Sequence, residues 1–486
     1  MSRGHLFISF PMPFLDDYPE IKIIKELARS RKVQVYLVGG FLRDYLLRRP
    51  CLDFDFAVGK NAVSLARAFA DKIKGAFVLL DDQFGCGRVV KKRSGAVRIF
   101  DFADYRAPGI AKDLAHRDFT INTFCLAVHE LSPTDHIEDG LLDMKKAKAD
   151  LKAKRIRMTS ATAFREDPLR ILRAFSLRAA LGFSIEPKTR VRMKTEGPLI
   201  RSVSFERVRD ELFKILETPR AAQVIKEMDR SGFLRNIIPQ ISVMENVEQG
   251  GYHHLGVWEH SLEALARMEG VLKEFEGDSD IGAYLAEPLA GMRTRRALLK
   301  MAVLLHDIGK PQTRVFDGER MTFHGHERVG KHIVRSIAKM LKLSTRERYI
   351  LEDMVLWHLR PGYLSNFKKP SDRMIFRYQR DTKEEAASIA LLSLADQRAT
   401  RGPLTTDEDQ RHHEAICRQM IQLYFAKKKE KPLPRLITGH DLIEKLKLTP
   451  SPLFAKILGA VEEQQATGKL TTKEDALLLA RKMAER

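Results

Sequence analysis

The chain has 486 residues, enough for about three domains of roughly 150 residues each, so a single small module is excluded. Lysine and arginine number 84 against 64 aspartate and glutamate, and the net charge of +20 favours nucleic acid as partner over a merely soluble basic protein. Four widely spaced cysteines without a C-x-x-C pair argue against a disulfide framework or a zinc knuckle, and no apolar run approaches the ~18 residues of a membrane span. These features predict a cytoplasmic protein.

The first predicted elements belong to an α/β domain. Up to about residue 157, β-type runs such as VQVYLV, DFDFAV, AFVLL and AVRIFDFADY alternate with helical stretches such as AVSLARAFADKI. From about residue 158 helical periodicity takes over. The segment DPLRILRAFSLRAALGF predicts a helix closed by Gly182, and FERVRDELFKILETP predicts another that stops before Pro219.

The rest of the chain is expected to be helical, with boundaries marked by turn residues. A turn-rich stretch between about 237 and 255 predicts a boundary, and EGDSDIGAYLAEPLAGM is expected to be a loop. The stretch AKKKEKPLPR predicts an exposed linker into a last small helical unit. The predicted segments are a head (1–157), a helical neck (158–236), a metal-binding helical domain (237–402) and a C-terminal helical segment (403–486).

Two carboxylates in the head indicate a metal site. Asp53 and Asp55 alternate with apolar residues in DFDFAV, so both project from one face of a strand. Neighbouring acids repel unless a cation lies between them, and Asp101 in RIFDFADYR is a candidate third carboxylate. Gly39 and Gly40, at the end of the preceding strand, let backbone N–H groups approach a phosphate. This combination predicts Mg²⁺-dependent transfer of a nucleoside phosphate.

The order of the motifs adds a family resemblance. LVGGFLRDYLL, DFDFAV, DLAHRDFTINTFCLAV, EDGLLDMKKA, EDPLRILRAFSLRAALGF and ERVRDELFKIL follow one another over about residues 35–218 and resemble the class II tRNA nucleotidyltransferase and bacterial poly(A) polymerase family. The resemblance implies an α+β head of the polymerase-β type, an all-α neck, and Asp53 and Asp55 as catalytic metal ligands, with Asp101 beside them. It implies nucleotide contacts from Gly39, Gly40, Arg43, Arg117, Asp118, Asn122, Glu166, Asp167, Arg170 and Arg173.

The EDPLR motif implies selection of the base by protein groups, because Glu166, Asp167 and Arg170 match the selecting positions of the family. Cytosine and adenine both present an amino donor beside a ring-nitrogen acceptor. An accepting Asp167 and a donating Arg170, three apart on one helix face, would complement this pattern. The alternative is that Asp167 caps a helix that Pro168 begins, and both roles stay open.

A second group of chemistry-bearing residues lies in the helical region, in WEHSL, LLHDIGKP, FHGHERVG, LWHLRPG and LADQRA. Its members are His260, His306, Asp307, His326, His358 and Asp396. Mixed imidazole and carboxylate ligands suit Mn²⁺, Ni²⁺, Co²⁺ or Zn²⁺. The order H, HD, H, H, D resembles the HD phosphohydrolase superfamily, which implies one or two metals with Lys310 nearby. His412 and His413 match no motif and are expected at turns or on the surface.

The sequence therefore predicts a template-independent RNA nucleotidyltransferase that adds C, A or both to tRNA 3′ ends, with all-α neck, HD and C-terminal domains after its α+β head. The short segment APGIAK, where full CCA-adding relatives carry a longer one, leaves the added bases open. Expected ligands are CTP, ATP and the tRNA acceptor arm, with Mg²⁺ in the head and Ni²⁺, Co²⁺ or Mn²⁺ in the HD domain. No DNA and no membrane are expected. The alternatives are a poly(A) polymerase and an HD phosphohydrolase whose head only binds RNA.

Overall fold

The computed structural model describes residues 14–83, 85–93, 96–132, 137–250, 254–316, 318, 320–402, 405–430 and 434–485. The chain divides into two compact units, Met1–Val203 and Ser204–Arg486, and the division falls inside the segment predicted as the neck. Within the described ranges, no helix is long and apolar enough to cross a membrane.

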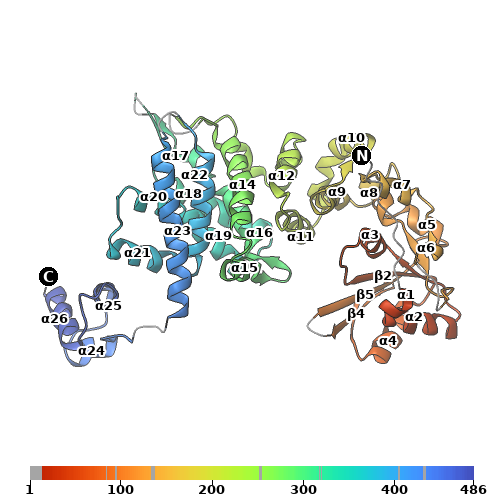
Figure 1. Cartoon of the computed structure of the whole chain (residues 1–486), viewed down its shortest axis with the longest axis horizontal. Helices are drawn as coiled ribbons and strands as arrows, with labels where there is room; N and C mark the ends of the chain where they lie inside the picture. The colour runs from red at the N-terminus through yellow and green to blue at the C-terminus, as the bar shows by residue number, and fades with distance from the viewer. Residues whose placement is uncertain are drawn as a thin grey trace. The chain divides into compact units, whose positions relative to one another are not determined.

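A seven-stranded sheet organises the first unit. Its strands are β1 (Val35–Val38), β2 (Asp53–Val58), β3 (Ala76–Asp81), β4 (Cys86–Arg93), β5 (Ala96–Asp104), β6 (Cys125–Ala127) and β7 (Leu141–Leu142). They lie in the order β3-β4-β5-β2-β1-β6-β7. Figure 1 labels three neighbours of this order, β4, β5 and β2. The β2 and β5 strands run parallel, and the other neighbouring pairs run antiparallel. This mixed sheet confirms the expected α+β head.

Helices connect and flank the strands of the sheet, and further helices follow them in the chain. They are α1 (Phe14–Asp17), α2 (Pro19–Ser30), α3 (Gly40–Leu46), α4 (Ala62–Ile73), α5 (Ile110–Ala115), α6 (Ile137–Gly140), α7 (Ala147–Lys152), α8 (Ala163–Glu166), α9 (Leu169–Leu181) and α10 (Pro187–Glu196). The α4 helix has the bounds of the predicted AVSLARAFADKI segment, and α9 ends at Gly182 with φ 72°, as the sequence predicts. A two-strand ribbon, β8 (Arg155–Ile156) with β9 (Ser184–Ile185), completes this unit.

An aromatic layer fixes how β2 and β5 sit in the sheet. Phe54 stacks on Phe100 with 4.8 Å between ring centroids, and Phe56 stacks on Phe102 at 4.9 Å. From α4, the ring of Phe69 lies 5.1 Å from that of Phe100. Replacing a packed Phe by Ala costs about 3–5 kcal/mol, so a one-residue slip that exposed these rings would be strongly disfavoured. The buried aromatic face thereby determines which residues occupy the opposite face.

The second unit is mostly helical. Its helices are α11 (Phe205–Leu216), α12 (Ala221–Arg230), α13 (Leu234–Ile237), α14 (Val257–Glu274), α15 (Ser279–Ala286), α16 (Arg295–Leu305), α17 (Lys310–Thr313), α18 (His326–Met340), α19 (Thr345–Trp357), α20 (Arg360–Ser365), α21 (Asp372–Thr382), α22 (Ala386–Ala399), α23 (Asp407–Lys429), α24 (Gly439–Glu444), α25 (Pro452–Ala466) and α26 (Lys473–Ala484). The ribbons β10 (Pro288–Ala290) with β11 (Arg293–Thr294) and β12 (Val315–Phe316) with β13 (Met321–Thr322) are its described strands. The apolar α22 packs between α14 and α23 (Figure 1).

One predicted loop is wrong. The segment EGDSDIGAYLAEPLAGM contains the helix α15, because the Asp278 side chain accepts hydrogen bonds from the N–H groups of Asp280 and Ile281 at 2.9 and 3.0 Å. Ile281, Tyr284 and Leu285 are buried at helical spacing. The acidic and glycine residues that suggested a loop thus include the N-cap of a short amphipathic helix.

Candidate active sites

The head presents its acidic residues on one face of the sheet, as the sequence predicts. In the parallel pairing of β2 with β5, Asp55 lies opposite Asp101. Asp53 and Asp55 are exposed, whereas the alternating Phe54 and Phe56 are buried. Carboxylates from two adjacent strands therefore gather opposite the aromatic layer.

Asp101 and Asp55 differ in their partners. The Asp101 carboxylate accepts hydrogen bonds from Nε and Nη2 of Arg88 on β4, both at 2.8 Å, a pairing that the sequence did not indicate. The pKa of Asp55 is raised first by partial loss of hydration and then by Asp101 and Asp53, against the opposing effects of Arg117 and Arg173. These carboxylates place several negatively charged oxygen atoms close together, and such oxygen ligands suit a hard cation such as Mg²⁺.

The glycine turn before α3 brings backbone close to these acids. Gly39 has φ 82° and ψ −144°, a conformation that favours glycine. A Cβ at this position would lie 3.1 Å from Oδ2 of Asp55 and 3.3 Å from Nη1 of Arg117. The Nε of Arg117 is 3.5 Å from a carboxylate oxygen of Asp113. Gly40 then begins α3. The turn therefore holds backbone and the Arg117 guanidinium beside Asp55.

Several predicted nucleotide-binding residues form one polar network. Arg43 donates from Nε and Nη2 to both oxygens of Asp44, at 3.0 and 2.7 Å, and from Nη1 to the Asn122 side chain at 2.6 Å. The Asn122 amide donates to Asp118 at 3.0 Å, and Nε of Arg173 lies 2.8 Å from Asp118. Burial alone would raise the pKa of Asp118, but Arg173, Asn122 and a backbone N–H lower it. Asp118 is therefore an anion that positions Arg173.

The EDPLR segment departs from its predicted geometry. The α9 helix begins at Leu169, and Asp167 precedes it with extended backbone at φ −149° and ψ 101°. The expectation that Asp167 and Arg170 share a helix face is therefore wrong, because Asp167 is not helical. Its Oδ1 accepts the N–H of Leu169 at 3.2 Å, which is a capping contact.

Arg170 is buried and holds neighbouring segments together. Its guanidinium donates to the carbonyl oxygen of Ala163 at 3.1 Å and to that of His116 at 2.6 Å. Glu166 lies 3.4 Å from Arg170 and accepts a 2.7 Å hydrogen bond from Thr162. The predicted base-selecting residues are thus neighbours. The hydrogen bonds of Arg170 also connect α9 to α8 and to the end of α5.

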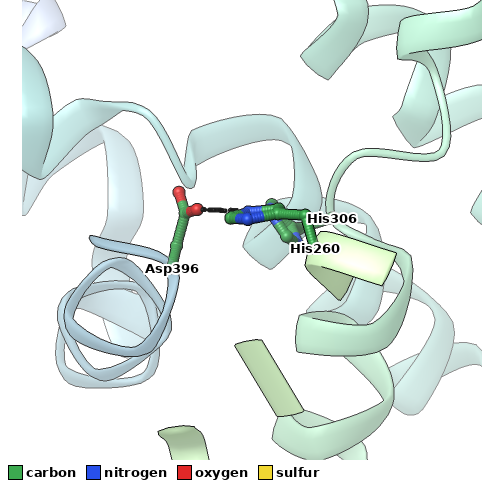
Figure 2. A group of neighbouring side chains, drawn as sticks. All are labelled: His260, His306 and Asp396. Carbon is green, nitrogen blue, oxygen red and sulfur yellow. Dashed lines mark hydrogen bonds and ion pairs between the residues drawn. The ribbon is translucent and has the colours of Figure 1, made fainter. Parts of the chain in front are cut away.

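The helical unit brings together the second predicted group. Figure 2 shows His260 from α14, His306 just after α16, and Asp396 from α22 with their side chains converging. Nε2 of His260 is 2.8 Å from Oδ1 of Asp396, and Nε2 of His306 is 3.6 Å from the same oxygen. The potential ligand atoms of these three residues all lie within 4.8 Å of one another.

Asp307 connects this trio to a second one formed with His326 and His358. Its Oδ1 is 3.3 Å from Nε2 of His326 and 3.8 Å from Nε2 of His358. Its Oδ2 is 3.2 Å from Nε2 of His306 and 2.7 Å from Nζ of Lys310. One carboxylate therefore faces both ligand groups, and Asp307 would help to hold one or two metal ions at this cluster.

Backbone carbonyl groups orient two of the histidine rings. Nδ1 of His326 and Nδ1 of His358 lie 2.8 and 2.7 Å from the carbonyl oxygen three residues earlier. A carbonyl only accepts, so Nδ1 carries the hydrogen and Nε2 keeps a lone pair. Burial, with His326 and His306, lowers the pKa of His358 to about 3. The two Nε2 atoms are 3.2 Å apart, and lone pairs facing at this distance fit a transition metal between them.

Charge in the cluster also favours a cation. Burial lowers the pKa of His306, but Asp307 and Asp396 outweigh it and raise that pKa to about 10. A proton on this imidazole compensates the two carboxylates in the absence of metal. The donor set therefore suits a positive ion held by nitrogen and oxygen ligands.

The sequence analysis did not identify His413 as a residue of this region, although it lies beside the cluster. The prediction that it is a turn or surface residue is wrong, because it is buried on α23 and its ring nitrogens lie 3.0 Å from Ser393 Oγ and 3.2 Å from Ser365 Oγ. All three residues line a cavity of about 370 Å³ that also reaches Asp307 and Asp396. A usable signal was present, since His413 begins the buried stripe that continues through Ile416, Cys417 and Met420.

Two further residues support the cluster. Gln249 accepts a 2.6 Å hydrogen bond from Nζ of Lys310, the lysine that contacts Asp307. A Cβ at Gly309 would overlap the carbonyl oxygen of His326 and lie 2.6 Å from the backbone nitrogen of Gly330. The spacing of His326 and Gly330, four residues on one helix, was the available signal for this close packing.

The fold and the two sites define a nucleotidyltransferase-type head combined with a helical HD domain. Residues 35–157 match the Poly A polymerase head domain family, and residues 252–401 match the HD domain family. The chain is 31% identical over 459 residues to the A-adding tRNA nucleotidyltransferase of Deinococcus radiodurans, with 92% of this chain and 95% of the relative covered. The chain belongs to the tRNA nucleotidyltransferase family, which confirms the resemblance given by its motifs.

Other relatives and solved structures agree with this assignment. A CC-adding tRNA nucleotidyltransferase of Geobacter sulfurreducens is 36% identical over 309 residues, covering 63% of this chain and 65% of the relative. A CCA-adding enzyme solved with CTP is 20% identical with a TM-score of 0.64, covering 97% of this chain and 96% of the other. The Thermotoga maritima CCA-adding enzyme complexed with tRNA is 21% identical with a TM-score of 0.59, covering 96% and 95%. These solved structures share the fold.

Proposed function

We propose that this protein adds C, A or both to tRNA 3′ ends, using CTP or ATP and no template. The observation that carries the proposal is the gathering of Asp53 and Asp55 on one face of β2, beside the Gly39 turn. Relatives named A-adding and CC-adding tRNA nucleotidyltransferases support the substrate, as do CCA-adding enzymes solved with CTP or tRNA. The net charge of +20 suits a polyanionic RNA.

In the head, Asp53 and Asp55 would hold Mg²⁺, which when bound stabilises charge on the attacking 3′ hydroxyl and the leaving pyrophosphate. Because Gly39 has no side chain, its backbone lies close to Asp55 and to the positive charge of Arg117, and a phosphate would bind beside these groups. The ionised Asp118 orients Arg173 toward the nucleotide. Asp101, paired with Arg88, supports the acidic face from the adjacent strand.

Incubation with separate tRNA transcripts tests this function and identifies the added bases. Transcripts that end at the discriminator base, at C and at CC are supplied with CTP and with ATP in separate reactions. Extension of the first two by CTP alone defines a CC-adding enzyme, extension of the third by ATP alone defines an A-adding enzyme, and both together define CCA addition. Continued addition of many A residues to any RNA would instead support a poly(A) polymerase.

We also propose that Glu166, Asp167 and Arg170 select the incoming base. The support is chemical: Asp167 accepts and Arg170 donates, and the two lie in one continuous segment with Glu166. A carboxylate offers about four lone-pair sites, so Asp167 can accept from a base amino group while it caps the Leu169 N–H. Arg170 would turn part of its guanidinium from the carbonyl oxygens of Ala163 and His116 toward the base.

The double variant Asp167→Ala, Arg170→Ala is expected to lose discrimination against UTP and GTP by roughly 10²-fold, because a site built from hydrogen bonds rejects a mismatched edge. The measurement is kcat/KM for each of the four nucleotides, together with Tm. Arg165→Ala is the matched control, because Arg165 is exposed on α8 and pairs with Glu196. If the double variant has a lower Tm but an unchanged choice of nucleotide, these residues act only in packing and helix capping.

A second activity is proposed for the HD domain, a metal-dependent phosphohydrolase that acts on 2′-, 3′- or 2′,3′-cyclic phosphates of RNA ends or small nucleotides. The supporting observation is that the ligand cluster opens into the 370 Å³ cavity, lined chiefly by polar side chains. His260, His306, Asp307, His326, His358 and Asp396 would hold one or two transition metals, which when bound supply a hydroxide near neutral pH. Lys310 would contact the phosphoryl group. Such hydrolysis would free the 3′ hydroxyl that the head extends.

We further propose the four-part division into head (1–157), neck (158–236), HD domain (237–402) and C-terminal segment (403–486). The family matches at 35–157 and 252–401 support the head and HD parts. A separate apolar cluster that includes Leu442, Ile457 and Val461 supports a distinct C-terminal part.

A further inference from the structure

A second cavity lies beside the cavity at the HD metal cluster and has a different lining. This basic groove, of about 560 Å³, is lined by residues that include Arg328, Lys331, Arg335, Trp357, Arg360 and Tyr363. It shares Leu359 with the cavity at the metal cluster. Leu359 directly follows the metal-ligand candidate His358 in the chain. The groove and the proposed hydrolytic site are therefore neighbours.

The short helix α20 separates the two cavities. Arg360 and Tyr363, three residues apart, line the basic groove, whereas Gly362 and Ser365, also three apart, line the metal cavity. Side chains at this spacing share a helix face, so the two cavities flank two faces of α20. Leu359, just after the end of α19, lines both cavities, so a flexible ligand held in one lies close to the other.

Ion pairing leaves the groove positively charged. Two carboxylates beside it are each shared by two arginines: Glu352 by Arg335 and Arg348 at 2.7 and 2.8 Å, and Asp381 by Arg360 and Arg380 at 2.6 and 2.9 Å. The first trio keeps one positive charge in excess. In the second, Arg380 also lies 3.9 Å from Glu463, a carboxylate that already pairs with Arg373 and Arg377, so arginines outnumber carboxylates there as well. Lys331 also lines the groove, and no described carboxylate lies within ion-pair distance of its ammonium, although its charge interacts with Asp353; Arg328 is offset by Glu327 at 3.7 Å. Cations therefore outnumber carboxylates in and beside the groove, which suits an anionic ligand.

Aromatic planes accompany these cations. Tyr363 is 55% exposed, and the guanidinium of Arg360 lies 4.8 Å from the ring centroid of the half-buried Trp357. An exposed ring beside arginine is a platform on which a nucleobase stacks while its phosphates contact the cations. A purely acidic peptide would use the charges but would leave these rings without a stacking partner.

We propose that the basic groove binds the single-stranded 3′ segment of an RNA and directs its terminal phosphate into the metal cavity. The direction of the strand rests on the proposed phosphohydrolase, whereas the binding itself does not. Bases stack on Tyr363 and Trp357, and the phosphates contact Lys331 and the arginine trios. The groove thereby favours RNA ends over free nucleotides, because only a strand fills both cavities.

The chain contains its own reporter for this binding. It has two tryptophans, of which Trp258 is 2% exposed and donates to Asp229 at 3.0 Å, whereas Trp357 lines the groove. Titration of the full chain with the pentanucleotide CCCCC is expected to quench Trp357 emission in a saturable way. Trp357→Phe is expected to abolish that quenching. A short RNA bound elsewhere in the chain leaves this signal unchanged.

Charge and stacking variants identify the groups that bind the strand. Lys331→Gln with Arg335→Gln is expected to weaken binding at least tenfold and to lower the slope of log affinity against log salt by about 0.7 for each phosphate that the protein no longer neutralises. Tyr363→Ala is expected to weaken binding about 5- to 100-fold. The matched control is Lys339→Gln, since Lys339 is exposed on the same helix but outside the groove. Its affinity should equal that of the unaltered protein.

Three results would overturn the proposal: no quenching by CCCCC at millimolar concentration, equal weakening by the Lys339 control, or equal quenching by hexaglutamate. Asp307→Asn separates this binding from the proposed hydrolysis. Quenching that persists in this variant, or in a protein that hydrolyses no phosphate ester, supports the groove and counts only against the phosphohydrolase. Hydrolysis of RNA ends without quenching rejects the groove and leaves the phosphohydrolase standing.

Discussion

Replacing Asp55 by alanine is expected to lower the rate of nucleotide incorporation into tRNA by roughly 10³-fold or more, with a similar loss for Asp53→Ala. Both side chains lie on the exposed face of β2, and the pKa of Asp55 is raised, first by loss of hydration and then by its acidic neighbours Asp101 and Asp53. Removing either one removes a ligand from the proposed Mg²⁺ site. Because each side chain is exposed, the aromatic core beneath it should be little affected.

The measurement is single-turnover extension of a tRNA transcript with CTP and ATP over a range of Mg²⁺ concentrations. Asp71→Ala provides the matched control, since it removes an exposed carboxylate from α4 in the same unit. Near-normal extension by Asp55→Ala, with unchanged Tm, would reject the mechanism. Asp101→Asn adds a finer distinction: a loss as large as that of Asp55→Ala would make Asp101 a metal ligand as well, despite its pairing with Arg88.

The second large effect is expected in the HD domain. His306→Ala with Asp307→Ala should lower phosphate-ester hydrolysis by about 10³-fold and abolish tight transition-metal binding, because Asp307 faces both ligand groups. Nucleotide addition should remain nearly unchanged, since Asp53 and Asp55 belong to the other compact unit.

Metal content by mass spectrometry and hydrolysis of 2′-, 3′- and 2′,3′-cyclic phosphate substrates provide the two measurements. Nitrogen ligands predict higher activity with Ni²⁺, Co²⁺ or Mn²⁺ than with Mg²⁺. His440→Ala is the control, because this exposed histidine on α24 pairs only with Glu444 among the ion pairs of the described residues. A protein that binds no transition metal and hydrolyses none of these esters would reduce the cluster to a structural role.

Local patterns in the sequence predicted a large part of the fold. Alternation in DFDFAV predicted the shared face of Asp53 and Asp55, and the glycine after α9 predicted the end of that helix, because both features depend on neighbouring residues alone. The HD motif residues also met as predicted. His260, His326 and Asp396 lie on helices, whereas His306, Asp307 and His358 directly follow helix ends, and the packing of these helices brings the six residues together.

Such local patterns could not predict contacts between segments that are distant in the sequence. Nothing local indicates that Arg88 pairs with Asp101, or that Arg170 donates to the carbonyl of His116, 54 positions away. The α15 helix and the burial of His413 were missed for a different reason, since acidic, glycine and histidine residues were weighed by composition rather than by the spacing of their apolar neighbours. In each case the deciding interaction was a cap or a tertiary contact.

The contact of Gly309 with the start of α18 has a consequence for sequence variation. Any side chain at 309 would force the segment after Asp307 away from the His326 carbonyl, so selection at this position is steric and would act even if metal binding were absent. A glycine two residues after a His-Asp pair therefore marks the close approach of two backbone segments. Only the ligands themselves indicate catalysis, and an HD domain that keeps its fold without its chemistry is expected to retain this glycine.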